Sequence, residues 1–256
     1  MMRSIFSTVS AAALLCAPPA FAKTKDFALK GYAMPADKPV SIILMRPDVQ
    51  VGELQAGGLP QPNADWTRAA RDNLAKAIEA NQKSRNVDFK ILSPDTPEAQ
   101  QIVADYEALH RAVANSIVEF AYGSKLPTKK GKNKNDYVFD WTLGPGTQKI
   151  GDLAGGNYAL FLYTRDNFAS ASRKAMQAVG MLGCLVGFCV VVGGGQHVAY
   201  ASLVETSTGN IVWFNILRGS DGDVREVAGA QSMVDSIMSS MPTRAAEAGP
   251  VEKKGR

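Results

Sequence analysis

The residue types that most often carry out chemistry are scarce in this chain. Among its 256 residues there are two histidines, His110 and His197, and three cysteines. The histidines do not form the H-x-x-x-H or H-x-H spacing of a zinc site, and no G-x-S-x-G segment places a nucleophilic serine. We therefore predict no catalytic residue, no metal ligand and no cofactor. His110 is interpreted as an exposed or boundary side chain, whereas His197 opens a strand and leaves a pH-sensitive or ligand-binding role as an alternative.

One glycine-rich segment has a superficial likeness to a phosphate-binding loop. Gly144, Pro145 and Gly146 precede Lys149 and Gly151. The order G-x-x-x-x-G-K-[ST] is missing, and the segment does not clearly follow a buried strand. We interpret it as a turn that leads into a short helix.

Charged side chains near expected strand or loop ends offer a second possible site. Arg165, Asp166 and Asp221 occupy such positions, but spacing alone establishes no pairing between them. They support an alternative function, in which a periplasmic protein binds or hydrolyses a small molecule in a cleft near Asp166 and Asp221.

The cysteines give little basis for a disulfide. Cys16 lies in an expected export signal, which leaves Cys184 and Cys189 in the mature chain. Neither a helix nor a strand brings residues at this spacing into disulfide geometry unless a turn lies between them. We expect two unpaired thiols, although an oxidising compartment would permit a bridge.

Hydrophobic periodicity predicts the elements that must position these residues. The fold class is α/β (α+β), a mixed sheet with helices packed on it, ending in a β-hairpin plus helix and carrying an apolar, glycine-rich insertion. Strands are expected at 39–51, 87–92, 157–164, 198–206 and 211–218. Helices are expected from Asp65, from Thr96 to Gly123, within 143–154 and at 223–241.

Composition limits the class of protein. The chain is 46% hydrophobic and 20% charged, with a formal net charge of +4. These values exclude a disordered, collagen-like or disulfide-dense chain, and the charge is too small to indicate nucleic-acid binding. We expect one α/β domain at 39–242, preceded by a flexible lead-in at 23–38 and followed by a polar tail at 243–256.

The first 22 residues are typical of a secretory signal peptide. Arg3 supplies a positive charge, a short apolar region follows, and Ala20 and Ala22 stand at the −3 and −1 positions of a cleavage site. We expect cleavage after Ala22 and export to the periplasm, with possible association with the outer membrane. A lipoprotein anchored through Cys16 is disfavoured, because Leu15 precedes the cysteine where a lipobox requires a small residue.

The strongest anomaly is the uncharged, glycine-rich segment at 175–195. As one helix its 21 residues would span roughly 31 Å, just enough for a bilayer core. Gly183 and Gly187 have the small-xxx-small spacing of packed membrane helices. Membrane contact, burial inside the domain and subunit packing remain open. The expected membrane or assembly contacts are Gly180, Gly183, Leu185, Gly187, Phe188 and Val191.

A lysine-rich loop at 125–136 is a candidate for binding an anionic surface. Its proposed contacts are Lys129, Lys130, Lys132 and Lys134. A merely solvated loop is the alternative interpretation.

The C-terminal third resembles a known family. The segment YASLVETSTGNIVWFNILRG at 200–219, followed by a helix that closes in Met241-Pro242, is similar to the end of CsgG/TolB-N-terminal-like bacterial envelope domains. The resemblance implies a βαβ-type domain that binds partners or oligomerises. Its motifs are structural, because Thr208-Gly209 makes a turn and Trp213 fills the core. The apolar insertion and the missing lipobox depart from a CsgG secretion pore.

Together these patterns predict an exported, non-enzymatic envelope protein. We expect its domain to bind an envelope protein or a second copy of the chain, its 175–195 segment to contact a membrane, and no nucleic acid to be bound.

Overall fold

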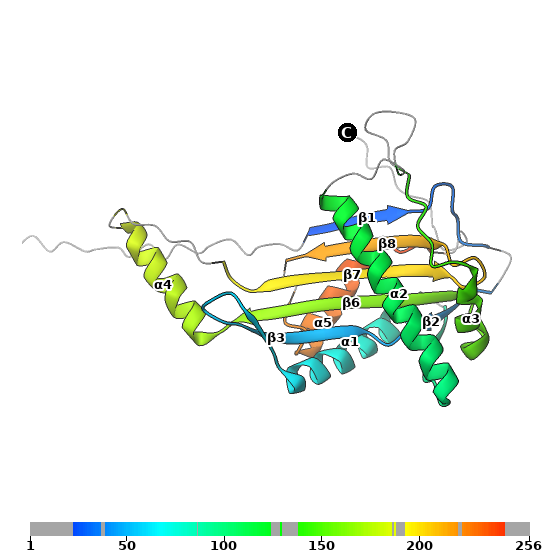
Figure 1. The fold of residues 1–256 in the computed structure, drawn as a ribbon, viewed down its shortest axis with the longest axis horizontal. Helices are drawn as coiled ribbons and strands as arrows, with labels where there is room; N and C mark the ends of the chain where they lie inside the picture. Colours follow the sequence, from blue (N-terminus) through cyan, green and yellow to red (C-terminus); the bar gives the residue numbers. More distant parts are fainter. Residues whose placement is uncertain are drawn as a thin grey trace, which may run out of the picture.

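The protein folds as a mixed β-sheet with helices on both faces, which confirms the predicted fold class (Figure 1). This computed structural model describes residues 23–36, 39–85, 87–123, 129, 138–185, 187, 193–219 and 222–243. The predicted signal peptide, most of the lysine-rich loop and nearly all of the polar tail lie outside these residues.

The elements follow one another in an order close to the predicted one. The strands are β1 (Lys23–Ala28), β2 (Ser41–Leu44), β3 (Asp48–Leu54), β4 (Pro60–Pro62), β5 (Asp88–Ile91), β6 (Tyr158–Ala169), β7 (Gln196–Glu205) and β8 (Ile211–Arg218). The helices are α1 (Ala64–Ser84), α2 (Pro97–Tyr122), a 3₁₀ turn at Pro145–Thr147, α3 (Gln148–Ala154), α4 (Ala171–Leu185) and α5 (Val227–Met238).

The long strand β6 organises the sheet. The strand order is β1-β8-β7-β6-β2-β5, and β3 continues alongside β6 beyond the end of β2. On one edge β6 runs parallel to β2 and β3, and on the other it runs antiparallel to β7. The mixed sheet therefore depends on one strand that pairs along most of its length on both sides.

Alternating side chains of β6 supply two hydrophobic cores. Leu160 and Leu162 pack with buried residues of α1 and α5, whereas Ala159 and Phe161 pack with α2 and α3. This period of two places one core on each face of the sheet. Trp213, which the sequence assigns to the core, is 1% exposed.

One of the two predicted helix caps is confirmed. The Thr96 side chain accepts a hydrogen bond from the Ala99 amide (3.2 Å), and α2 ends at Gly123 as expected. At α1 the cap is Asn63, which accepts from Trp66, whereas Asp65 lies inside the first turn. The expected cap at Asp65 is therefore wrong by two positions, because Asn63 holds the extended backbone of a cap.

Two predicted segments differ from the structure. The single strand expected at 39–51 is divided into β2 and β3, because Pro47 lacks an amide hydrogen and interrupts the ladder. The flexible lead-in expected at 23–38 instead begins with β1, which pairs antiparallel with β8 from Lys23 opposite Arg218 to Ala28 opposite Trp213.

Candidate functional site

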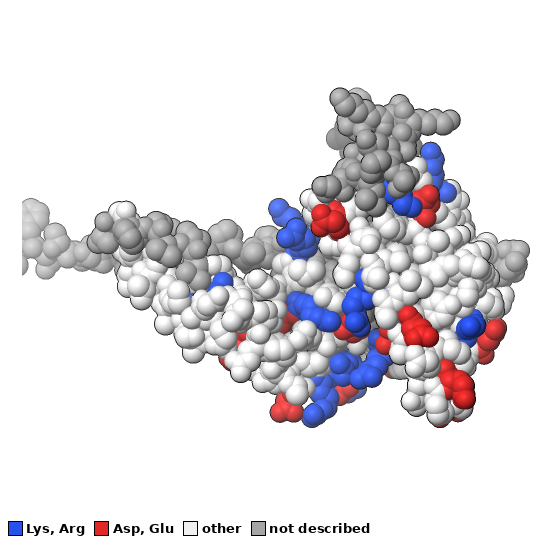
Figure 2. Space-filling view, viewed as in Figure 1, with Lys and Arg blue, Asp and Glu red and all other residues white. Residues whose placement is uncertain are grey.

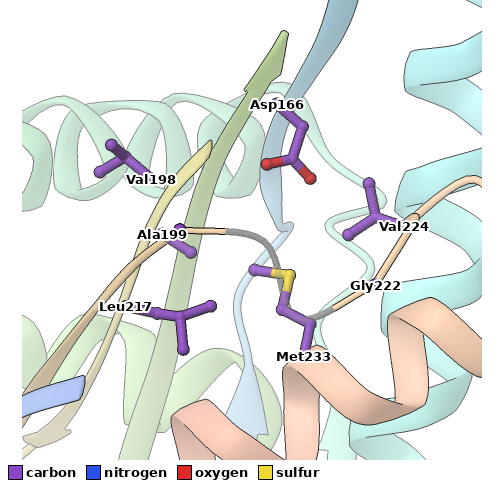
Figure 3. Close-up of a pocket in the computed structure, with 8 residues that line it drawn as sticks. Asp166, Val198, Ala199, Leu217, Gly222, Val224 and Met233 are labelled. Atoms are coloured by element: carbon purple, nitrogen blue, oxygen red, sulfur yellow. The ribbon is translucent and has the colours of Figure 1, made fainter. Parts of the chain in front are cut away.

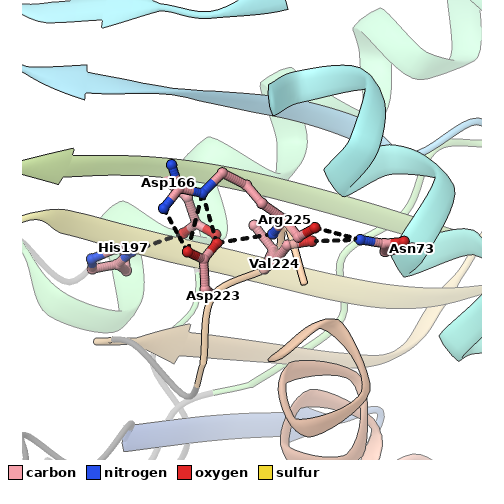
Figure 4. A network of polar contacts seen from close by, with 6 residues as sticks. All are labelled: Asn73, Asp166, His197, Asp223, Val224 and Arg225. Atoms are coloured by element: carbon pink, nitrogen blue, oxygen red, sulfur yellow. Dashed lines mark hydrogen bonds and ion pairs between the residues drawn. The ribbon is translucent and has the colours of Figure 1, made fainter. Parts of the chain in front are cut away.

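Two neighbouring strands place a carboxylate beside an imidazole near the base of α4. Asp166 on β6 and His197 on β7 are direct partners in the antiparallel register, so their side chains lie on the same face. Asp166 Oδ1 lies 3.2 Å from His197 Nδ1, and Asp166 is only 4% exposed (Figure 4). The sequence names both residues separately, but only the register pairs them.

A second ion pair adjoins the first. The Arg225 guanidinium donates to both carboxylate oxygens of Asp223, with distances of 2.5 to 3.1 Å. These hydrogen bonds hold the pKa of Asp223 below its ordinary value. Asp221, the residue expected here, lies outside the described residues. Sequence reasoning missed Asp223 and Arg225, for which the D-x-R spacing after β8 was the available signal.

Aromatic rings and an amide hold Arg225 in place. Its guanidinium lies 4.3 Å from the Trp66 ring centroid and 4.0 Å from that of Phe168. The Asn73 side chain donates to the Arg225 carbonyl oxygen at 2.8 Å. This network ties α1, the end of β6 and the segment before α5 together (Figure 4).

A small cavity adjoins this network among the described residues. Asp166 lines it together with mainly apolar side chains that include Leu217, Val224 and Met233 (Figure 3). Its volume is about 10 Å³, which is scarcely enough for one water molecule. A histidine–carboxylate pair can orient a general base, and the pairs Asp166–His197 and Asp223–Arg225 also hold the strand ends together. We call these four residues the clamp. The small-molecule-binding or hydrolytic alternative stays a prediction, because Asp221 lies outside the described residues.

The clamp lies where α4 leaves the sheet. The Ser170 hydroxyl accepts from the Arg173 amide (3.2 Å). The Arg173 side chain donates to the carbonyl oxygens of Gln55 (3.1 Å) and Gly193 (2.9 Å). Beyond this base α4 projects away from the rest of the domain (Figure 1).

Large apolar side chains of α4 face solvent. Val179, Met181 and Leu182 are 69%, 70% and 64% exposed, and Met176 is 44% exposed. Figure 2 shows the projecting helix as an almost uncharged surface beyond its base. The part of the 175–195 segment that lies in α4 is therefore not buried inside the domain, where one of the three interpretations placed it.

The predicted contact residues in this region do not share one helix. Gly180 and Gly183 belong to α4, with Gly180 buried, and Leu185 is its last residue. Gly187 follows the helix with a φ of 84°, a left-handed conformation, so the Gly183–Gly187 pair is not a helix-packing face. Phe188 and Val191 lie outside the described residues. Within the described residues, no helix is both long and apolar enough to cross a membrane.

Cys184 corrects the expectation of two unpaired thiols. It is disulfide-bonded, and its partner lies outside the described residues. A regular helix or strand would keep cysteines at this spacing apart. In the structure α4 ends at Leu185, and the chain turns at Gly187. That turn is the condition under which closely spaced cysteines can meet.

The described part of the lysine-rich loop contains Lys129 alone. Its amino group pairs with the Asp140 carboxylate and lies 4.6 Å from the Trp141 ring centroid, and its side chain is 17% exposed. Lys129 is therefore engaged within the fold rather than presented to a surface. Lys130, Lys132 and Lys134 lie outside the described residues, and their anionic-surface contact remains a prediction.

His110 is buried, which corrects its expected place at the surface. It is 5% exposed, its ring stacks on Phe161 at 4.1 Å, and its Nε2 lies 2.6 Å from the Ser202 hydroxyl oxygen. Burial lowers the pKa of His110 to about 3, so the ring is neutral near pH 7. Across the described ranges, no three His, Cys, Asp or Glu side chains gather in a metal-binding group.

Comparison with known proteins gives distant structural matches. No protein-family model and no curated protein matches the chain. A PelC dodecamer from Paraburkholderia phytofirmans aligns with a TM-score of 0.36 and 12% identity over 88% of this chain and 99% of that one. A variant of the same PelC in another crystal form aligns with a TM-score of 0.37 and 12% identity, over 88% of this chain and 100% of that one.

A third similar structure is the lipoprotein GNA1162 from Neisseria meningitidis. It aligns with a TM-score of 0.29 and 11% identity over 78% of this chain and 96% of that one. The matches thus include an oligomeric protein and a lipoprotein, with no specific support for the CsgG/TolB resemblance. Structural matches with TM-scores and identities this low assign no function to this chain.

Proposed function

We propose that this chain is an exported, non-enzymatic envelope protein that contacts a membrane surface through α4. The observation that carries the proposal is the exposure of Val179, Met181 and Leu182 on a helix that projects from a well-packed domain. Exposed apolar side chains that lie close together are typical of membrane or protein contacts.

The length and charge of α4 favour contact with the bilayer surface. Its 15 residues span about 22 Å, which is less than the roughly 30 Å of a hydrocarbon core. The helix contains no acidic residue, and Lys174 at its base is exposed. A helix of this kind can bury its apolar side chains at the interface while a basic side chain remains among anionic headgroups.

The α/β domain would then hold α4 in position and bind an envelope partner. The clamp of Asp166, His197, Asp223 and Arg225 anchors the strand ends from which the helix departs. Export with cleavage after Ala22 and the CsgG/TolB-like classification belong to the same proposal. Mass spectrometry of the secreted chain should find Lys23 at its N-terminus.

The test is flotation of the mature chain with vesicles of phosphatidylcholine and phosphatidylglycerol. We expect the wild type to float with the vesicles and the triple variant Val179→Ser, Met181→Ser, Leu182→Ser to remain behind. Each buried apolar side chain contributes about 1.5–3 kcal/mol, so losing Val179 and Leu182, which share one side of the helix, already weakens partition by more than about 100-fold.

Matched controls come from apolar residues exposed elsewhere. Leu59 is 74% exposed and Val227 is 72% exposed, so Leu59→Ser and Val227→Ser remove similar surface away from α4. These variants should float like the wild type. A wild type that does not float, but forms an oligomer that the triple variant loses, would overturn membrane contact and favour self-association.

A further inference from the structure

A break in strand pairing opens a cavity under α2, on the opposite side of the sheet from the clamp. The strand β2 pairs with β6 up to Leu160, and β3 resumes the pairing at Tyr163. The cavity has a volume of about 20 Å³, and its lining includes Arg46 and Tyr200. It lies just beyond the carboxyl end of the parallel strand β2, and open α/β sheets commonly bind ligands at such strand ends.

Three arginines and two carboxylates surround this cavity. Both Arg111 and Arg165 pair with Asp48, at 2.9 Å and 2.8 Å, so each carboxylate oxygen of Asp48 is already occupied. Arg46 is exposed at the cavity, and no hydrogen bond or ion pair to its side chain occurs among the described residues. The nearby charge of Arg46 lowers the pKa of Glu107, against the larger effect of burial. Figure 2 shows basic side chains on this face, with acidic side chains among them.

Two buried polar atoms at the same cavity have no hydrogen-bond partner within the described protein. They are the hydroxyl of Tyr200, a residue only 2% exposed, and Oε1 of Glu107. Burial raises the pKa of Glu107. The Tyr200 hydroxyl can donate a hydrogen bond, and a buried donor of this kind normally has an acceptor.

We propose that this cavity binds one oxygen of an oxyanion, a carboxylate or a phosphate, with the Arg46 guanidinium as counter-charge and the Tyr200 hydroxyl as buried donor. The three arginines outnumber the two carboxylates of Asp48 and Glu107, which disfavours a cation, and an apolar group would leave the Tyr200 hydroxyl unsatisfied. The volume admits an oxygen-sized group, so the rest of the ligand would lie outside, toward Arg46. This site is independent of α4 and of the proposed membrane contact.

The experiment is thermal unfolding of the mature chain with increasing inorganic phosphate or acetate, at constant ionic strength set by chloride. A ligand that binds only the folded state raises Tm as its concentration increases. We expect a rise for the wild type, and the larger of the two effects identifies the preferred oxyanion. No rise with either anion beyond that of chloride would overturn the proposal.

Variants separate binding from general charge effects. Arg46→Gln should weaken anion affinity by about tenfold or more, because a charge-assisted hydrogen bond is lost. Arg68→Gln removes the same charge from an exposed pair on α1 and should bind like the wild type. If both variants lose the same amount of anion affinity, the effect comes from net charge alone, and the proposed site is wrong.

Tyr200→Phe gives a second readout. Without the unpartnered hydroxyl, the variant should unfold at the same temperature as the wild type or higher when no anion is present. Its Tm should nevertheless rise less with anion. An unchanged anion response in Tyr200→Phe would contradict the role of the hydroxyl as donor.

Discussion

The cavity under α2 and the projecting helix α4 depart from ordinary protein solvation in opposite directions. Around the cavity, the polar groups of His110, Tyr200 and Glu107 are removed from water. On α4, large apolar side chains such as Val179 and Leu182 are left in water. Folded proteins normally pair buried polar groups and hide contiguous apolar ones, so both regions are candidates for function.

The two regions also differ in how the fold holds them. The cavity residues come from α2 and from paired strands, and Tyr200 stacks on Tyr163 at 4.4 Å. The helix α4 is fixed at its base through Arg173 and the neighbouring clamp. Substitutions at the cavity should therefore change stability, whereas substitutions on α4 should change binding alone.

The largest expected effect is the response of the cavity region to acid. The pKa of His110 is about 3 in the folded chain, against 6.5 for a free side chain, so only the unfolded chain gains this proton between those values. We expect the His110 contribution to stability to be complete above pH 6.5 and to fall by up to about 1.4 kcal/mol per pH unit as the pH drops toward 3. Denaturant unfolding at several pH values measures this slope.

The matched variants for this prediction are His110→Gln and His197→Gln. The first should flatten the slope, because a neutral amide replaces the buried ring without titrating. The second should retain the His110 contribution. An unchanged slope in His110→Gln would show that another group causes the acid sensitivity.

An intermediate effect is expected at Asp48. Asp48→Asn leaves Arg111 and Arg165 without their carboxylate, and the side chains of this group are only partly exposed. We expect a loss of about 1–2 kcal/mol in unfolding free energy. Asp65→Asn breaks an exposed pair with Arg68 and should cost less than about 0.5 kcal/mol. Equal costs for the two variants would remove the distinction between the cavity and the ordinary surface.

The smallest effect on stability is expected on α4. The triple serine variant of Val179, Met181 and Leu182 should change unfolding free energy by less than about 0.5 kcal/mol per site, since these side chains are exposed. Chemical denaturation without vesicles measures this. A large destabilisation would mean that α4 packs against the domain in solution.

Local patterns predicted the elements well and the candidate sites poorly. Thr96 and Gly123 bound α2 as expected, because capping and helix ending depend on neighbouring residues. The Asp166–His197 pair required the register of β6 against β7, which joins residues 31 positions apart. The cavity under α2 forms only because Pro47 interrupts the strand pairing and α2 crosses the sheet above it. Neither Arg46 nor Glu107 lies in a distinctive sequence pattern that could have predicted it.

The sequence by itself determined the order of the main helices and strands, though not β1, β4 or the division between β2 and β3. It also determined the alternating pattern that builds two cores and the uncharged character of the segment that becomes α4. These properties depend on residue type and near-neighbour spacing. Tertiary structure decided that His110 is buried, that Cys184 is disulfide-bonded, and that Val179 and Leu182 face solvent. Burial and pairing depend on which distant surfaces meet, and a periodic pattern specifies a face without specifying what covers it.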